Sequence, residues 1–232
     1  MSNRQLLMGA SLVLTLLVWQ SMLGTMAMAI GFLVMIFIHE MGHYLAAKQL
    51  GLPVSAPIFT PMGAVILMPT LPKSSQEEAY IALAGPVLGT VGALAGFVLG
   101  HVMGVRDLIL VSQLAFMLNL FNLIPLAPMD GGRISMVINR HLWMLGAPLL
   151  AWVVYSSGFS SMTVLVAAMV AFQAYQDVNM RKQLAQVNPQ YFQPSLPVRL
   201  TYIAAYLGLG AFLVWAYFFP AGLASVLVAA GL

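Results

Sequence analysis

The chain has 232 residues, of which 61% are hydrophobic and only 6% are charged, and its formal net charge at pH 7 is +3. Soluble domains carry about 25% charged residues, so this composition excludes a soluble globular protein and indicates a polytopic membrane protein. The nine Lys and Arg residues are scattered, which fits orientation in a membrane better than nucleic-acid binding. The absence of cysteine excludes disulfides, thiolate metal sites and a cysteine nucleophile.

The length suffices for about six or seven spans of roughly 20 residues, without room for a separate soluble domain. We therefore expect an all-α polytopic membrane protein in which residues 1–232 form one helical bundle. The expected spans are residues 5–21, 25–50, 79–101, 108–124, 141–155, 160–176 and 200–219. A cleaved signal peptide is the alternative for the first span. Cleavage at residues 27–29 would leave the second span too short to cross a bilayer, so we favour an uncleaved span.

The second expected span contains the sequence His-Glu-Met-Gly-His at residues 39–43. Helical residues four apart point the same way, so His39 and His43 can bind one metal ion. Glu40 follows the first of these residues and can reach a metal-bound water without being a ligand itself. Because Arg4 and Lys48 mark the cytoplasmic ends of the first two spans, the motif is expected toward the cytoplasmic side.

Residues 52–72 contain five prolines, too many for a helix, around an apolar and β-prone centre at residues 63–68. Non-helical backbone at membrane depth needs protein or a water-filled cavity beside it. We therefore expect a re-entrant loop or β-ribbon next to the metal site, with an edge that could pair with an extended substrate strand. A plain interfacial loop is the alternative.

Two polar stretches are expected to lie in water. Glu77 and Glu78 could be taken for catalytic carboxylates, but acids favour the first turn of a helix, and a solvated helix start is the better interpretation. Residues 177–199 are polar, contain three prolines and are expected to form a surface segment.

A second informative stretch is found where the fourth span ends, at residues 119–133. It contains Asn119, Asn122 and Asp130, the last of them followed by two glycines. Asp130 is the candidate third metal ligand, because two histidines and one carboxylate leave the fourth position of a catalytic zinc for water. The alternative is a turn residue or helix cap, since Asp-Gly-Gly is common turn chemistry.

Three motifs occur in order along the chain: the His-Glu-x-x-His motif at residues 39–43, Ala-Gly-Pro at residues 84–86, and Asn-Leu-Ile-Pro through Asp-Gly-Gly at residues 122–132. Together they resemble the site-2 protease family of intramembrane zinc metalloproteases. The resemblance covers roughly residues 25–140, the expected catalytic core, with additional helices in residues 141–232. It resembles a minimal family form without a PDZ or CBS module.

This resemblance implies that His39, His43 and Asp130 bind one Zn²⁺ per chain and that Glu40 is the catalytic base. It also implies that residues 52–72 form the family's membrane-inserted β-element near the substrate path. One departure concerns Gly89, where the family often has Asn, so the resemblance does not carry over the substrate or intermediate contact expected there.

The sequence therefore predicts an intramembrane zinc endopeptidase that hydrolyses peptide bonds within or near transmembrane segments of membrane-anchored regulatory proteins. Asn119 and Asn122 are candidates for stabilising the oxyanion. The resemblance favours a bacterial or archaeal cytoplasmic membrane, and nothing in the sequence indicates an oligomeric state. The alternative is a membrane metal-ion transporter using the same His and Asp ligands, although a carrier has no use for the non-ligand acid Glu40. A catalytically silent scaffold is a third hypothesis.

Overall fold

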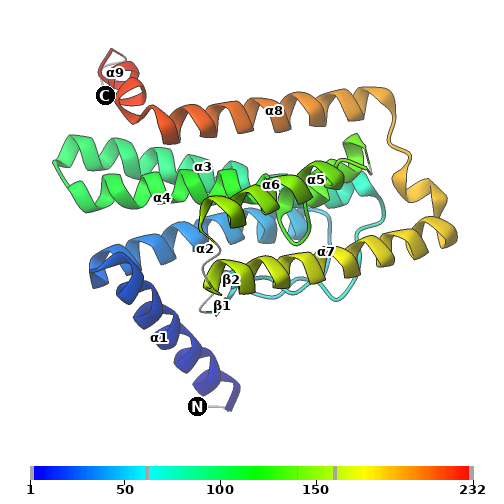
Figure 1. Ribbon diagram of the computed structural model, residues 1–232, viewed down its shortest axis with the longest axis horizontal. Coiled ribbons are helices and arrows are strands. Elements are labelled where there is room, and N and C mark those ends of the chain that lie inside the picture. The colour runs from blue at the N-terminus through cyan, green and yellow to red at the C-terminus, as the bar shows by residue number, and fades with distance from the viewer. Residues whose placement is uncertain (1–2, 61–62, 140, 159–160, 230–232) are drawn as a thin grey trace. The chain divides into compact units, whose positions relative to one another are not determined.

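The structure is a computed structural model that describes residues 3–60, 63–139, 141–158 and 161–229, which are predominantly helical (Figure 1). The elements follow in the order α1 (Asn3–Leu23), α2 (Met26–Gln49), β1 (Ile58–Thr60), β2 (Gly63–Val65), α3 (Ser75–Met103), α4 (Arg106–Asn122), α5 (Asp130–Ile138), α6 (Trp143–Ser156), α7 (Ser161–Val187), the 3-10 helix η1 (Pro189–Phe192), α8 (Leu196–Phe218) and α9 (Pro220–Ala229). The chain divides into two compact units. The first unit comprises Met1–Thr70, Ala84–Leu120 and Leu209–Leu232, and the second comprises Leu71–Leu83 and Phe121–Gly208.

Helix α2 begins and ends where the sequence predicts. The side chain of Thr25 caps its first turn by accepting a hydrogen bond of 3.1 Å from the backbone N–H of Met28. After its last turn, Gly51 has a φ of 71°, a left-handed conformation that ends helices. Buried residues recur every three or four positions along α2, so they form one face of the helix, and both histidines of the motif belong to that face.

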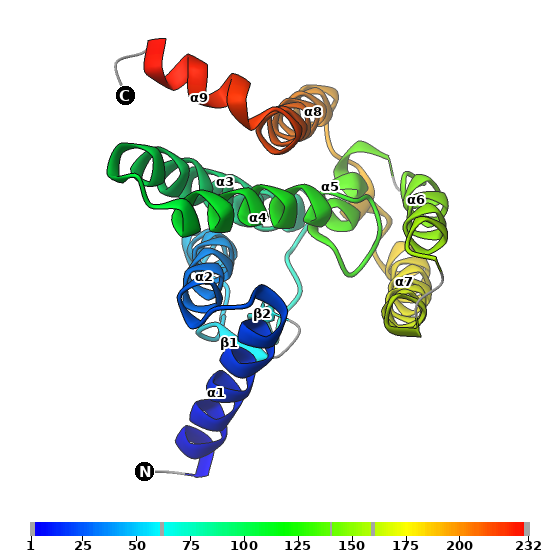
Figure 2. The same ribbon diagram turned by 60° about the vertical axis from the view of Figure 1, so that its left-hand side comes forward.

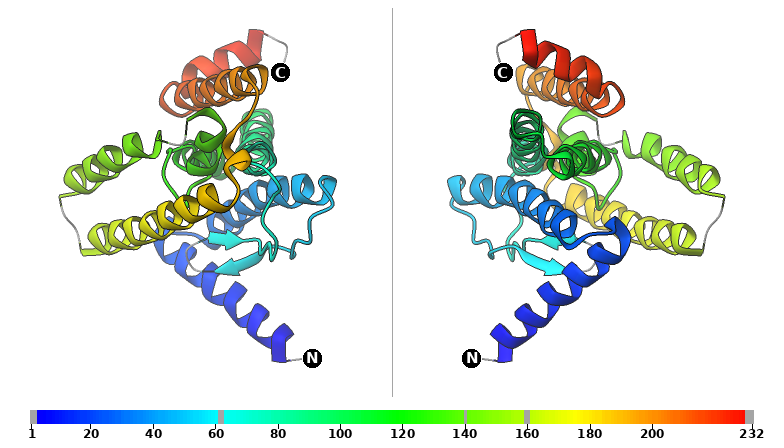
Figure 3. Two further views of the ribbon diagram at one scale, coloured as in Figure 1. Left: turned by 90° about the vertical axis from the view of Figure 1, so that its right-hand side faces the viewer. Right: turned by 90° about the vertical axis from the view of Figure 1, so that its left-hand side faces the viewer.

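The first unit contains a small antiparallel sheet next to α1 and α2. Strands β1 and β2 pair with Ile58 opposite Val65 and Thr60 opposite Gly63, and Figure 3 shows them side by side. The Ser11 hydroxyl of α1 donates a hydrogen bond of 2.5 Å to the carbonyl of Phe59, whose ring stacks 6.2 Å from that of Phe37 on α2. A β-element in the proline-rich loop is therefore confirmed, whereas its insertion into a membrane stays a prediction.

Glycines allow close helix packing within the first unit, as the glycine-rich sequence of α3 predicts. A Cβ atom added at Gly92 would lie 2.9 Å from the side chain of Ile38 on α2. A Cβ atom at Gly96 would lie 2.6 Å from the hydroxyl oxygen of Ser112 on α4. The two glycines are four residues apart, and each removes the atom that would hold a neighbouring helix away.

In the second unit, α6 and α7 run side by side (Figure 2). Their apolar core joins Val170 and Ala174 of α7 to Leu126 and Met129, which lie in the segment just before α5. Leu150 of α6 packs against the same cluster. Helix α5 and the last eleven residues of α7 lie outside the expected spans.

The second unit also contains a buried ion cluster that corrects the sequence prediction for Glu78. This residue is only 8% exposed, and its carboxylate accepts hydrogen bonds of 3.2 and 3.0 Å from the two terminal nitrogens of Arg181. It also accepts one of 2.8 Å from the Tyr191 hydroxyl, and the Nε of Arg133 lies 3.5 Å away. The expectation of a solvated helix start is therefore wrong for Glu78.

Most of residues 177–199 are exposed, as expected for a surface segment, but Arg181 and Tyr191 are buried in this cluster. Helix α7 continues to Val187, and Asp177 and Arg181, one turn apart on it, pair at 2.5 Å. Burial would lower the pKa of Arg181, but the carboxylates of Glu78 and Asp177 together outweigh burial and raise it. Burial raises the pKa of Tyr191, and Glu78 raises it further, so the hydroxyl stays protonated and donates its hydrogen bond.

Replacing Arg181 with Met is expected to lower the free energy of unfolding by about 3–5 kcal/mol. Glu78 would stay buried but would lose the guanidinium group that binds both of its carboxylate oxygens. Chemical unfolding in detergent, followed by circular dichroism, measures the loss. The neighbouring substitution Lys182→Met, at an exposed position, is the matched control and should change stability by less than about 0.5 kcal/mol. Equal stability of the Arg181 variant and the parent would show that the ion cluster does not support the fold.

Among the residues that the structure describes, three helices are long and apolar enough to cross a membrane: α2, α3 and α8. Three further apolar helices are shorter, namely Gly9–Leu23, Trp143–Ser156 and Pro220–Ala229. The predominantly helical, membrane-type character of the chain is thus confirmed, while the number of six or seven spans stays a prediction.

Candidate metal centre

Two of the candidate ligands, His39 and His43, lie one turn apart on the buried face of α2, and each is only 4% exposed. Their Nε2 atoms are 3.1 Å apart. Two nitrogens bound at about 2.0–2.1 Å to one tetrahedral zinc ion are separated by about 3.3 Å. The pair is therefore already close to the spacing that a shared zinc ion requires.

The tautomer of His39 is set by Asn119 on α4, which is only 1% exposed. The amide nitrogen of Asn119 donates a hydrogen bond of 2.7 Å to the carbonyl of Ala115. The amide oxygen is thereby oriented to accept one of 2.8 Å from Nδ1 of His39. A proton on Nδ1 leaves the lone pair of Nε2 available to a metal, which is the usual role of a partner behind a histidine ligand.

Glycines bring α3 close to this pair within the first unit. A Cβ atom at Gly85 would collide with the imidazole ring of His43. A Cβ atom at Gly42, between the two histidines on α2, would collide with the backbone carbonyl of Ala84. Gly42 and Gly85 therefore both allow α3 to pack directly against the turn of α2 that carries the two histidines.

Gly89 allows the same approach one turn further along α3. A Cβ atom there would collide with the amide oxygen of Asn119, the atom that accepts from His39. Any larger side chain at this position would displace the amide of Asn119. The glycine at this position thus leaves room for the amide of Asn119 on α4.

Glu40, the candidate base, is the residue after His39 on α2 and is half-buried. Because it is one position further along the helix, its side chain leaves the helix about 100° away from that of His39. This spacing keeps Glu40 off the line of the two histidines, which fits a neighbour of the ligands better than a third ligand on the same helix.

Asp130 and Asn122 lie in the second unit. Asp130 is the first residue of α5 and is 7% exposed, and Asn122 is the last residue of α4. Cβ atoms at Gly131 and Gly132 would collide with the backbone of the preceding segment, at Leu123 and at Ala127 respectively. The two glycines therefore fold this segment tightly against the start of α5, which buries Asp130 at a helix N-terminus.

The sequence predicts the histidine pair, Glu40 and Asp130 as site residues, but two contacts around the histidines were missed. The hydrogen bond between His39 and Asn119 joins residues 80 positions apart, so no local pattern reveals it. The need for Gly42 was also missed, although the spacing of two histidines around a glycine, together with the glycine-rich α3, is a signal that could have found it.

The comparisons with known proteins agree with the resemblance. Residues 27–106 match the model of Peptidase family M50. Zinc metalloprotease MJ0392 of Methanocaldococcus jannaschii is 28% identical over 193 residues, which cover 71% of this chain and 56% of that protein. Rip3 of Mycobacterium tuberculosis is 30% identical over 123 residues, which cover 50% of this chain and 30% of Rip3.

A solved structure, the site-2 protease from Methanocaldococcus jannaschii, aligns with a TM-score of 0.51 and 25% identity. The alignment covers 71% of this chain and 87% of that structure. The chain thus spans about half the length of MJ0392 and under a third of Rip3. The family match contains both histidines and Glu40, and the Asp130 region lies after its last residue. These similarities confirm the resemblance drawn from the sequence: part of the chain matches Peptidase family M50, and the chain is similar to a site-2 protease.

Proposed function

We propose that the chain is a zinc-dependent intramembrane endopeptidase with His39, His43 and Asp130 as zinc ligands and Glu40 as catalytic base. The observation that carries this proposal is the 3.1 Å spacing of the Nε2 atoms of His39 and His43 on a helix apolar enough to span a membrane. Asp130 adds a buried carboxylate, and the donor set of two imidazoles and one carboxylate suits a catalytic zinc.

When bound, zinc lowers the pKa of a coordinated water toward neutrality and polarises the scissile carbonyl. Glu40 accepts a proton from the water as its oxygen adds to the carbonyl carbon, and then delivers that proton to the leaving amine nitrogen as the carbon–nitrogen bond breaks. Asn122 donates to the oxyanion. Asn119 serves as a positioning residue instead, because its amide oxygen is used by His39 and its nitrogen by Ala115.

The substrate in this proposal is a transmembrane segment of a membrane-anchored regulatory protein. A helical substrate must unwind before hydrolysis, because its backbone carbonyls are occupied. The edge of the β1–β2 sheet offers extended backbone with which such a segment can pair. Residues 1–232 act as one membrane-embedded domain of six or seven spans in a bacterial or archaeal cytoplasmic membrane, with the site toward the cytoplasm and the core in residues 25–140.

The reaction class is tested with the purified chain in lipid vesicles. A transmembrane peptide added to these vesicles should yield two products, identified by mass spectrometry, and a zinc chelator should stop their formation. The transporter hypothesis predicts the opposite result, which is uptake of zinc into the vesicles without any cleavage. That result would replace the peptidase proposal.

Replacing Asn119 with Leu is expected to lower zinc affinity by about 10–100-fold, because His39 would lose the acceptor that fixes its Nδ1 proton. Competition with a zinc-chelating dye measures the change. Asn119→Asp is the matched control, since a carboxylate oxygen can accept from the same Nδ1 atom and should restore most of the affinity. Equal affinity of the Leu variant and the parent would remove the positioning role.

A further inference from the structure

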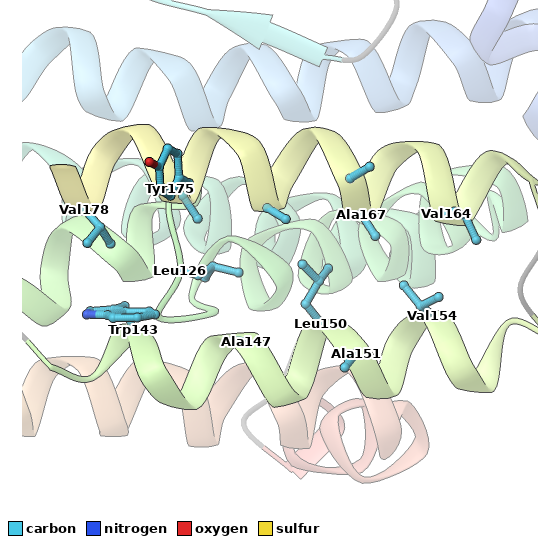
Figure 4. Close-up of a pocket in the computed structure, with 13 residues that line it drawn as sticks. Leu126, Trp143, Ala147, Leu150, Ala151, Val154, Val164, Ala167, Tyr175 and Val178 are labelled. Carbon is cyan, nitrogen blue, oxygen red and sulfur yellow. The ribbon is translucent and has the colours of Figure 1, made fainter. Parts of the chain in front are cut away.

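The second unit contains an apolar slot between α6 and α7 with a volume of about 710 Å³ (Figure 4). This volume falls within the range of about 300–1,000 Å³ typical of small-molecule sites. Only Trp143 and Tyr175, among its lining residues, carry a polar side-chain atom. Much of the lining is alanine, such as Ala147 on α6 and Ala171 on α7, so the slot exists because these side chains are too small to fill it.

The slot continues at one end into a mouth that is more polar than the slot, which we define as two adjoining cavities of about 520 and 350 Å³. Trp143 and Val178 line both the slot and the larger mouth cavity. His141 and Phe192 line both mouth cavities. Figure 4 shows Trp143 and Val178 at one end of the slot and Val154 and Val164 at the other. An apolar channel thus has one polar opening.

The mouth is basic. Lys182 lines the larger cavity and Arg199 the smaller one, and both residues are exposed. Arg181 also lines the larger cavity, but it is bound to Glu78 and Asp177. The second unit, residues 71–83 and 121–208, contains six Lys and Arg and four acids, and two of these acids, Glu78 and Asp177, bind Arg181. The charge of the mouth therefore suits an anion.

We propose that the slot and its mouth bind one anionic phospholipid, with an acyl chain between α6 and α7 and the phosphate at Lys182 and Arg199. Basic pockets between membrane helices are a recurring way of holding anionic head groups. The choice of a phospholipid as the occupant rests on the slot and the mouth together. A transmembrane helix would match the apolar slot alone, whereas a phospholipid has an apolar tail and a negative head in the same arrangement. The proposal depends on the membrane location of the chain and not on peptidase activity.

The test uses the full chain, purified in detergent and stripped of lipid, and the fluorescence of Trp143. Phosphatidylglycerol or phosphatidylcholine with brominated acyl chains is titrated in, and the contribution of Trp143 is obtained by difference from a Trp143→Phe variant. We expect saturable quenching of Trp143, with a higher affinity for phosphatidylglycerol. Lys182→Gln and Arg199→Gln should each lower that affinity about five-fold and leave the affinity for phosphatidylcholine unchanged.

Lys73→Gln, which removes an exposed cation elsewhere in the second unit, is the matched control and should change neither affinity. Ala171→Leu should fill the slot and weaken quenching by both lipids. Equal affinities of the parent for the two lipids would overturn the proposal, as would phosphatidylglycerol affinities unaffected by the Lys182 and Arg199 variants. Quenching by a brominated transmembrane peptide that phosphatidylglycerol does not displace would assign the slot to a helix and also overturn it.

Discussion

Cleavage of a transmembrane peptide should fall by at least about 100-fold when Glu40 is replaced with Gln, while the zinc content of the protein stays the same. General acid–base catalysis contributes typically 10²–10⁴-fold to a rate, and the amide of Gln cannot take a proton from water. Glu40 is not among the three proposed ligands, so its loss should affect kcat and leave the metal in place. Product formation under saturating peptide, together with metal analysis of the same sample, measures both effects.

Glu77→Gln is the matched control for this experiment. Glu77 is also half-buried, but it lies in the first turn of α3, where its carboxylate accepts a hydrogen bond from the backbone of Lys73. Its replacement should leave cleavage unchanged. A Glu40→Gln protein that cleaves as fast as the parent would remove Glu40 from the mechanism, and one that loses its zinc would make Glu40 a ligand.

Zinc affinity should fall by more than about 100-fold when Asp130 is replaced with Ala. Loss of a residue that only supports a ligand costs about 10–100-fold in affinity, so loss of a ligand itself should exceed that range. The remaining two imidazoles cannot hold a catalytic zinc against a chelator, because such sites use three protein ligands. Competition with a chelating dye gives the affinity, and metal analysis after dialysis gives the zinc retained.

The control here is Asp107→Ala, which removes an exposed carboxylate from the first turn of α4. Its zinc affinity should equal that of the parent. Unchanged zinc content in the Asp130→Ala protein would exclude Asp130 as a ligand. It would support the alternative interpretation, in which Asp130 only helps to start α5. The comparison with Asn119→Leu is informative as well, because a positioning residue should cost less affinity than a ligand.

The parts of the site that the sequence predicted are those that depend on local geometry. His39 and His43 are four residues apart on a strongly apolar helix, and helical periodicity alone places them on one face. The limits of α2 were also predictable, because the cap at Thr25 and the left-handed Gly51 are local signals. The β-element was predictable because prolines exclude a helix between residues 52 and 72.

The errors concern contacts between residues far apart in the sequence. Glu78 was expected to be solvated, because the sequence does not show that Arg181, 103 residues later, binds it. For the same reason the sequence did not show that Arg181 and Tyr191 are buried within an otherwise largely exposed segment. The bond from Asn119 to His39 is a third such case. In a chain with only six acidic residues, a carboxylate and an arginine just outside the ends of different expected spans are candidates for an ion pair.

The central claim, that this chain is a zinc peptidase, is tested most directly by adding zinc back to protein from which all metal has been removed. Cleavage of a transmembrane peptide should be absent in the metal-free protein, rise in proportion to added zinc and reach its plateau at about one zinc ion per chain. Cleavage by the metal-free protein at the rate of the untreated protein would contradict the claim.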